Sequence, residues 1–178
     1  MNRKLFITIH LYLASFFAPF VLLVATSGGL YLVGVKGSVE QSPVYVGSAS
    51  IDTKSPRLKQ DIEALLQTAG VADYSFEYVK VKGDTLWTRP TSREHYVITL
   101  VDGMAQVDYA LPSIQSRMIE LHKGHGPTLF KTFQKIFAVG LLCIFLSGVW
   151  LGLSASNLRS STAVTVLTGS LVFAFLLF

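Results

Sequence analysis

The stretch "LFITIHLYLASFFAPFVLLVATSGGLYLVGV", residues 5–35, decides the architecture of this chain. It contains no Asp, Glu, Lys or Arg, and its one side chain that titrates near neutral pH is His10. About 20 apolar residues are enough to cross the hydrocarbon core of a bilayer, so the stretch predicts a transmembrane helix. A cleaved signal peptide is the alternative, because Arg3 and Lys4 precede the stretch. However, the apolar core of a signal peptide is only about 7–15 residues long.

Two more uncharged runs, residues 136–155 and 162–178, lie toward the other end of the chain. With 51% hydrophobic residues in a chain of 178, the protein is too apolar for an ordinary soluble domain of this size. We therefore expect a multi-pass membrane protein with three transmembrane helices, within 1–35, 122–155 and 162–178. A short loop, 156–161, joins the last two.

The region between the first two helices, residues 36–121, has a different composition. It holds all 11 acidic residues and nine of the 15 basic ones, so its net charge is 9 − 11 = −2. A nucleic-acid-binding module would need a basic stripe, which this balance does not provide. The single cysteine, Cys143, lies in an apolar run, which excludes a disulfide framework and a cluster of thiolate metal ligands.

Residues 36–121 have the pattern of a small α+β module. Ser55 and Pro56 can begin an amphipathic helix that ends before Gly70, and its apolar positions recur at helical spacing at Leu58, Ile62, Leu65 and Leu66. Two alternating runs follow, residues 74–88 and 94–110, each broken by a Gly-Asp or Asp-Gly pair that favours a hairpin turn. We expect three or four antiparallel strands packed against the helix.

A second helix is predicted from Ser113, with Ile114, Met118 and Leu121 on one face. It leads into "ELHKGHGPTLFKTFQK", residues 120–135, a polar collar at the membrane surface. Here Gly126 is placed to cap the next helix and Pro127 to be its first residue. The lysines of this collar reach the lipid headgroups. By charge alone, the lysines that flank the helices slightly favour an N-terminus outside the cytoplasm.

Small residues recur along the apolar helices at three-, four- and seven-residue steps. Such a stripe leaves room for a flat macrocycle or for a second helix packed closely, and helix packing is the commoner use. His10 is followed by one such stripe, which consists of Ala14, Ala18, Ala25 and Gly29. The later helix contains a second pair, Gly148 and Gly152.

Two segments carry a family resemblance. Residues 3–32, "RKLFITIHLYLASFFAPFVLLVATSGGLYL", resemble the opening helix of bacterial PepSY-associated transmembrane proteins. That helix has a basic start, a histidine at its head, and Thr/Ser-Gly followed by Leu near its far end. Residues 121–153, "LHKGHGPTLFKTFQKIFAVGLLCIFLSGVWLGL", resemble the family's later segment, in which a His-x-x-His-Gly stretch precedes a helix with Ser-Gly and tryptophan. Residues 36–121 are compatible with a PepSY-type module by pattern and not by motif.

The resemblance implies a bacterial inner-membrane protein whose residues 36–121 lie in the periplasm. Some members of the family are haem-containing reductases linked to iron and siderophore uptake. By this resemblance, the candidate ligands of a haem b iron are His10, His122 and His125. We prefer His125 slightly over His122, because Gly126 and Pro127 fix it at the mouth of the helix bundle. Nicotinamide and flavin fingerprints are not seen in the sequence, so a reductase of this kind would receive its electrons from another protein or the quinone pool.

One chain offers no obvious pair of histidines for one haem. A membrane haem of this type usually takes one imidazole on each face of the iron. His122 and His125 project from one side if their helix continues, and His10 lies about 30 Å away along a transmembrane helix. A haem would therefore need a homodimer, a partner subunit in a larger membrane complex, or a sixth ligand other than histidine.

Two functions remain open at this point. The first is a haem-linked electron-transfer subunit that passes electrons toward a ferric-siderophore or another periplasmic acceptor, and not a self-sufficient enzyme. The second is a non-catalytic, membrane-anchored module whose periplasmic domain binds or restrains a partner.

Overall fold

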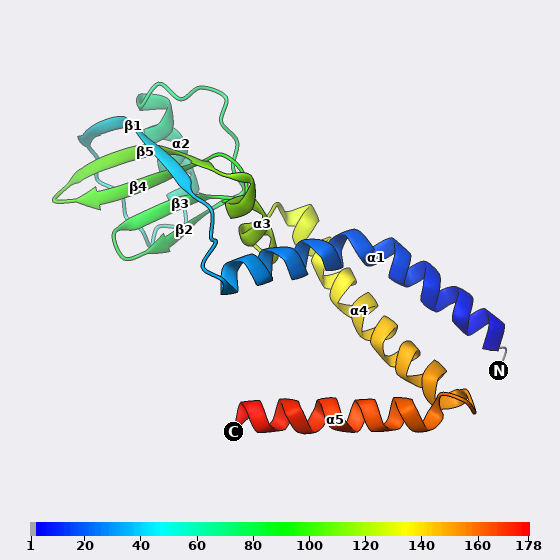
Figure 1. Cartoon of the computed structure of the whole chain (residues 1–178). Coiled ribbons are helices and arrows are strands. Elements are labelled where there is room, and N and C mark those ends of the chain that lie inside the picture. The colour runs from blue at the N-terminus through cyan, green and yellow to red at the C-terminus, as the bar shows by residue number, and fades with distance from the viewer. Residues whose placement is uncertain (1–2) are drawn as a thin grey trace. The chain divides into compact units, whose positions relative to one another are not determined.

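The computed structural model describes residues 3–178 (Figure 1). Contacts divide the chain into two units, which are described separately below: Leu22–Gln134, and the residues up to Val21 together with Lys135–Phe178. The elements in chain order are α1 (Arg3–Leu32), β1 (Val39–Ser48), α2 (Leu58–Thr68), β2 (Tyr78–Lys82), β3 (Thr85–Arg89), β4 (His95–Val101), β5 (Met104–Pro112), α3 (Ile114–His122), α4 (Thr128–Ser154) and α5 (Arg159–Leu177).

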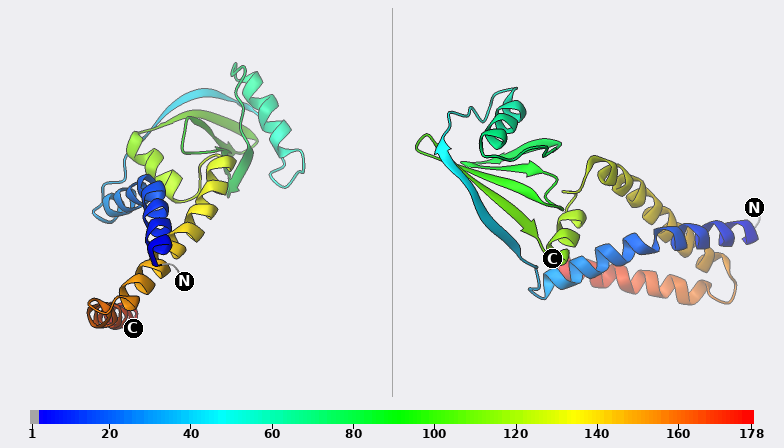
Figure 2. Two further views of the ribbon diagram at one scale, coloured as in Figure 1. Left: turned by 90° about the vertical axis from the view of Figure 1, so that its right-hand side faces the viewer. Right: turned by 90° about the horizontal axis from the view of Figure 1, so that it is seen from above.

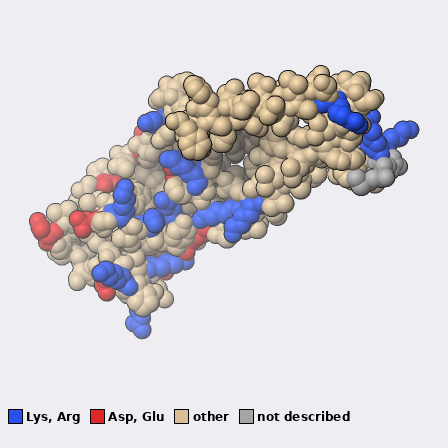
Figure 3. Space-filling model, turned by 90° about the horizontal axis from the view of Figure 1, so that it is seen from below, with Lys and Arg blue, Asp and Glu red and all other residues tan. Residues whose placement is uncertain are grey.

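Three helices, α1, α4 and α5, are long and apolar enough to cross a membrane. They have 30, 27 and 19 residues, and at about 1.5 Å per residue even the shortest matches a hydrocarbon core of about 30 Å. On the face drawn in Figure 3, Asp and Glu side chains lie on the sheet module, and the long helical surfaces are largely uncharged. The coarse prediction of a membrane-associated protein with a small α+β module is confirmed.

The five strands form one antiparallel sheet in the order β1-β5-β4-β3-β2. Both predicted hairpins are present. In the β4–β5 turn, Asp102 and Gly103 have φ angles of 49° and 76°, as a tight hairpin of this class requires. The prediction of three or four strands missed β1, because its sequence does not alternate and it contains Pro43. The register of β1 on β5 shifts between Pro43 and Tyr45, where a residue without a backbone N–H is tolerated.

Helix α2 packs on one face of the sheet and closes its core (Figure 2). The helix begins at Leu58, two residues later than Pro56, because the Arg57 amide donates to the Ser55 hydroxyl in a preceding turn. The core consists of side chains from α2 and from the facing side of the strands, which include Ile62, Leu65, Leu66, Phe76, Leu86, Tyr96, Ile98, Ala105 and Val107.

Helix α3 begins after Ser113, whose hydroxyl accepts a hydrogen bond from the Ser116 amide. The predicted start is therefore confirmed, but the predicted buried face is not. Ile114 is 79% exposed, whereas Ser116 and Ile119 are buried. The buried face of α3 is set by its packing against β5, which the apolar spacing of a short helix does not specify.

In the unit that contains the early part of α1, aromatic and small residues pack α1 against α4. Phe17 is buried, its ring fills the space beside Gly140, and its centroid lies 5.5 Å from that of Phe137. At the other end of α4, Gly152 lies against Thr162 of α5. His10 lies beside Ser147 and Gly148, in the last third of α4.

Candidate functional site

His10 is held by a serine of α4. Its Nδ1 atom lies 2.8 Å from the Ser147 hydroxyl, which in turn donates to the Ile144 carbonyl at 3.0 Å. A hydroxyl has a single hydrogen, and a carbonyl can only accept one. In the tautomer that satisfies both contacts, the Ser147 oxygen accepts from the Nδ1–H of His10, and Nε2 is the nitrogen with the lone pair.

His122 is held in the same way by a serine of α1. Its Nδ1 atom lies 3.0 Å from the Ser27 hydroxyl, which donates to the Val24 carbonyl at 3.2 Å. Ser27 is fully buried. In the tautomer that satisfies both contacts, Ser27 donates to the carbonyl and accepts from the Nδ1–H of His122, and Nε2 is again the nitrogen with the lone pair.

In both places the serine is followed by a glycine that makes room for the imidazole ring. A Cβ atom built on Gly28 would lie 3.3 Å from Cε1 of His122, and one built on Gly148 would lie 3.3 Å from Cε1 of His10. The two Ser-Gly pairs are thus two copies of one local arrangement, in which the hydroxyl fixes the tautomer and the missing side chain admits the ring.

His122 lies at an apolar groove of about 400 Å³, a size typical of small-molecule sites. Two cations flank the groove, because the Nζ atoms of Lys36 and Lys123 lie 5.0 and 5.7 Å from the ring centroid of Tyr31. Apolar walls, a free imidazole nitrogen and basic rim residues together fit a flat apolar group with anionic substituents. The lining residues are Ser27, Gly28, Tyr31, Leu32, Ile119, His122 and Lys123.

His125 does not share a site with His122. Helix α3 ends at His122, and Gly124, with φ at 77°, turns the chain. The Nδ1 atom of His125 lies 2.7 Å from Oε2 of Glu120, in a polar setting. The helix does not continue through both histidines. They therefore do not project from one side of it.

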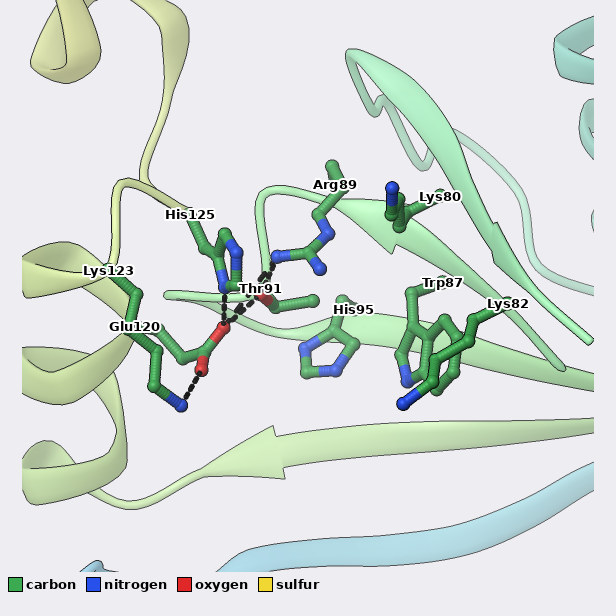
Figure 4. A pocket seen from close by; sticks show the side chains of 9 residues that line it. All are labelled: Lys80, Lys82, Trp87, Arg89, Thr91, His95, Glu120, Lys123 and His125. Atoms are coloured by element: carbon green, nitrogen blue, oxygen red, sulfur yellow. Dashed lines mark hydrogen bonds and ion pairs between the residues drawn. The ribbon is translucent and has the colours of Figure 1, made fainter.

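His125 and Glu120 line a second cavity, a polar cleft of about 460 Å³ on the side of the sheet opposite α2 (Figure 4). Its lining comes from β2, β3, β4 and the segment around the end of α3, and consists of Lys80, Lys82, Trp87, Arg89, Thr91, His95, Glu120, Lys123 and His125. We call this cavity the basic cleft.

Glu120 is the acidic centre of the basic cleft. It accepts hydrogen bonds from the Thr91 hydroxyl at 2.5 Å and from Lys123 Nζ at 3.3 Å. Nη1 of Arg89 donates to the same threonine hydroxyl at 2.7 Å and lies 3.7 Å from the carboxylate. Burial raises the pKa of Glu120, but the bonds from Thr91 and His125 outweigh it and hold the pKa below its ordinary value. The carboxylate is therefore charged at neutral pH.

His95 forms the floor of the basic cleft beside Arg89. It is 4% exposed, and its Nδ1 donates to the Arg93 carbonyl at 2.9 Å. Burial lowers the pKa of His95, although the bond to the carbonyl opposes this. The ring is therefore neutral at pH 7, with its lone pair on Nε2.

The predicted packing residues have different surroundings. Gly148 and Gly152 face His10 and Thr162, so both are used for packing within their own unit. Ala14 and Ala18 are half-buried. A Cβ atom built on Gly29 would meet nothing within 4 Å.

Comparisons of the chain with family models, characterised proteins and solved structures found no match. Within residues 3–178 there is also no group of three or more His, Cys, Asp or Glu side chains placed to hold a metal ion. Haem is a separate case, because its iron takes only one or two protein ligands.

Several residues that build these sites were not predicted from the sequence. The serines that hold the histidines, Ser27 and Ser147, were visible only as parts of Ser-Gly pairs. For the basic cleft, the only available signal was the alternation that puts Lys80 and Lys82 on one face of a strand. The contact of Glu120 with Thr91 joins elements that are 29 residues apart, which no local pattern specifies.

Proposed function

We propose that this chain is a PepSY-type subunit of the bacterial inner membrane that takes part in haem-linked electron transfer. The observation that carries the proposal is the imidazole of His122, fixed by Ser27 with Nε2 free, at the groove beside Lys123. Metal-bound histidines almost always donate their other ring N–H to a fixed acceptor, as His122 does here. A bound haem b would supply one-electron redox chemistry at this place.

The residues around His122 have distinct tasks in this proposal. Ser27 orients the ring and keeps its proton on Nδ1, so that Nε2 can act as an iron ligand. Gly28 leaves space for the ring edge. Lys36 and Lys123 offer positive charge to carboxylate substituents, and the apolar walls offer contact area to the macrocycle.

His10 is the second candidate ligand, since it is held by Ser147 in the same manner. His125 ranks below both, because its Nδ1 pairs with a charged carboxylate inside a polar cleft. Each candidate site contributes one imidazole, so the second axial ligand has to come from another chain or from a residue other than histidine. We therefore propose a homodimer or a larger membrane complex, with the stripe of small residues as one contact surface.

The first experiment is the reduced-minus-oxidised visible spectrum of the full chain, purified after expression with haem available, with a pyridine haemochrome count per chain. We expect b-type bands that disappear in His122→Ala or His10→Ala and persist in the control His95→Asn. Half a haem per chain would support a dimer. A folded but colourless wild-type protein would overturn the haem proposal.

The dimer has its own test, which uses the stripe on α1. Ala18→Leu should lower the oligomer size in detergent if a second copy packs against this stripe. Gly169→Leu, a substitution at an open position on α5, is the control. An unchanged size in both variants would remove the stripe from the proposed interface.

The proposed periplasmic position of the sheet module rests on the family resemblance and runs against the lysine bias. Gly83, in the β2–β3 turn, is exposed and accepts an insertion without breaking a strand. A reporter that is active only after export, inserted after Gly83, should be active. Activity of a cytoplasmic reporter at this position would overturn the proposed localisation.

The alternative function is a non-catalytic, membrane-anchored binding module. The basic cleft favours it, because three of its charged side chains, Lys80, Lys82 and Arg89, have no part in the haem proposal. The two functions are compatible in one protein, and the cleft can be tested independently.

A further inference from the structure

The basic cleft contains more positive charge than its own carboxylate can neutralise. Lys80, Lys82, Arg89 and Lys123 face a single acid, Glu120, so the formal net charge of the lining, counted over Lys, Arg, Asp and Glu, is 4 − 1 = +3. Glu120 already interacts with Arg89 and Lys123. No hydrogen bond or ion pair joins the side chain of Lys80 or Lys82 to another residue in the described range 3–178.

Strand geometry brings these unpaired lysines together on one side of the sheet. Lys80 and Lys82 are two residues apart on β2, so both point away from the core and their Cα atoms are about 7 Å apart. Trp87 lies directly opposite Lys80 in the β2–β3 register, and Arg89 follows two residues later on the same face. The arrangement is therefore set by the backbone and not by flexible loops.

Arg89 shows that the cleft is built and not only a charged surface. It is 91% buried, since 9% of its surface is exposed, and its Nε has no hydrogen-bond partner among the described residues. Burying a charged group with an unsatisfied donor is costly, and native proteins usually do so for a reason. Figure 4 shows the guanidinium directed into the cleft between His125 and Trp87.

We propose that the basic cleft binds a phosphate ligand with a total of two negative charges. Planar guanidinium groups bind phosphate through paired N–H donors, and lysines add charge without demanding one geometry. The cleft has a net charge of +3. Binding a single carboxylate would reduce it to +2, whereas binding two negative charges would reduce it to +1. The net charge of the cleft thus favours phosphate over carboxylate.

Two sources can present two phosphate charges. One is the headgroup of cardiolipin, whose two phosphodiesters carry one charge each, and the other is a soluble phosphate monoester, which carries both charges on one phosphate. The headgroup is a natural candidate, because Lys123 and His125 lie just before α4, one of the helices long enough to cross a membrane. Basic pockets beside membrane helices do bind lipid phosphates. A soluble ester would reach the same donors from the aqueous side.

The experiment uses the full chain with Trp150→Phe, so that Trp87 is the remaining tryptophan and its fluorescence reports the cleft. One arm titrates inorganic phosphate onto protein in zwitterionic phosphatidylcholine nanodiscs. The other arm compares these nanodiscs with nanodiscs that contain cardiolipin, without added phosphate. Saturation in the first arm identifies a soluble phosphate, and a response confined to the second identifies a headgroup. Either result supports the proposal.

The decisive variant is Lys80→Gln/Lys82→Gln, because both side chains are exposed and their loss leaves the fold intact. We expect it to weaken binding at least tenfold. The matched control, Lys54→Gln/Arg57→Gln, removes the same charge from exposed residues before α2 and should bind as the wild type does. Arg89→Lys, which keeps the charge but loses the planar fork, should also weaken binding.

The proposal is overturned if neither phosphate nor cardiolipin changes the Trp87 signal, or if the cleft variant and the control bind equally. It is also overturned if an acidic peptide saturates the cleft and phosphate does not compete with it, since that result would identify a protein partner. His122→Ala should retain phosphate binding, so failure of the haem proposal leaves this result unaffected.

Discussion

Glu77 caps the N-terminus of α4 across 51 residues of sequence. Its Oε1 accepts the backbone N–H of Thr128 at 2.8 Å, and its Oε2 accepts the hydroxyl of Thr128 at 2.6 Å. The backbone amide of Glu77 donates to the Arg89 carbonyl, so the capping residue is itself anchored beside β3. The sheet module therefore supplies the helix cap that the sequence assigned to Gly126.

Removing this cap should destabilise the unit that contains both residues. Thr128 presents two donors to Glu77, its backbone N–H and its hydroxyl. In Glu77→Gln only one side-chain oxygen can accept, and the NH₂ group that replaces the other oxygen faces a donor. We expect a loss of about 1 kcal/mol in the free energy of unfolding, typical of a lost helix cap. Denaturant unfolding in detergent at pH 7, followed by circular dichroism, measures it. Glu63→Gln, which breaks an exposed pair with Lys59, is the control and should cost less.

The same pair predicts a pH dependence. The hydrogen bonds from Thr128 lower the pKa of Glu77 in the folded protein. A group whose folded pKa is depressed contributes stability that is present above its unfolded pKa, about 4.3 for glutamate, and lost as the pH falls through the folded value. The difference in the free energy of unfolding between wild type and Glu77→Gln should therefore be largest at pH 7 and should shrink below about pH 4. A constant difference would contradict this account.

Ser27→Ala tests whether the serine orients a ligand. His122 would keep its place beside Gly28 but lose the acceptor that fixes its tautomer. If His122 binds haem iron, affinity should fall by about 10–100-fold, the usual effect of removing an outer-shell partner. Haem titration of the apoprotein measures it. Ser170→Ala, which removes a hydroxyl bonded only to the Val166 carbonyl, should leave affinity unchanged. Equal affinities in both variants would remove the positioning role of Ser27.

How far the sequence could predict this molecule depended on how local each signal was. The apolar runs predicted α1, α4 and α5, because a membrane-crossing segment is defined by composition and length. The hairpins were predicted because Gly83 and the Asp102-Gly103 pair are turn signals within a few residues. Strand β1 was missed, since it is held by pairing with β5 and not by its own pattern.

The candidate sites were less predictable, because each one joins distant parts of the chain. The histidines were visible, and so were the Ser-Gly pairs, but the sequence did not show that Ser27 holds His122 across 95 residues or that Ser147 holds His10 across 137. Arg89 in particular lies just outside the two alternating runs, 74–88 and 94–110, and no local pattern marked it as buried. Its burial depends on α3, which brings Glu120 over the sheet.

The burial of His95 leads us to expect a second, separate dependence of stability on pH. Burial lowers its pKa in the folded protein below the unfolded value of about 6.5. The unfolded chain then binds a proton at a higher pH than the folded one, so stability is lost as the pH falls from about 6.5 through the folded pKa. His95→Asn keeps an N–H donor for the Arg93 carbonyl and removes this titration. Its unfolding midpoint should change less between pH 7.5 and 5 than that of wild type or of His122→Asn, and an equal change would contradict the assignment.

Gly148→Leu separates the role of the glycine in admitting His10 from its role as a contact for another chain. Because a Cβ at this position already lies 3.3 Å from the imidazole, a leucine has to push the ring away from Ser147. Overpacking of this kind costs about 1–3 kcal/mol, so the unfolding temperature in detergent should fall, and less so for Gly148→Ala. Gly169→Leu, with open space around its Cβ, should leave it unchanged. If Gly148→Leu instead lowers the oligomer size while the unfolding temperature stays constant, the glycine serves a contact between chains, and the pairing of His10 with Ser147 does not depend on it.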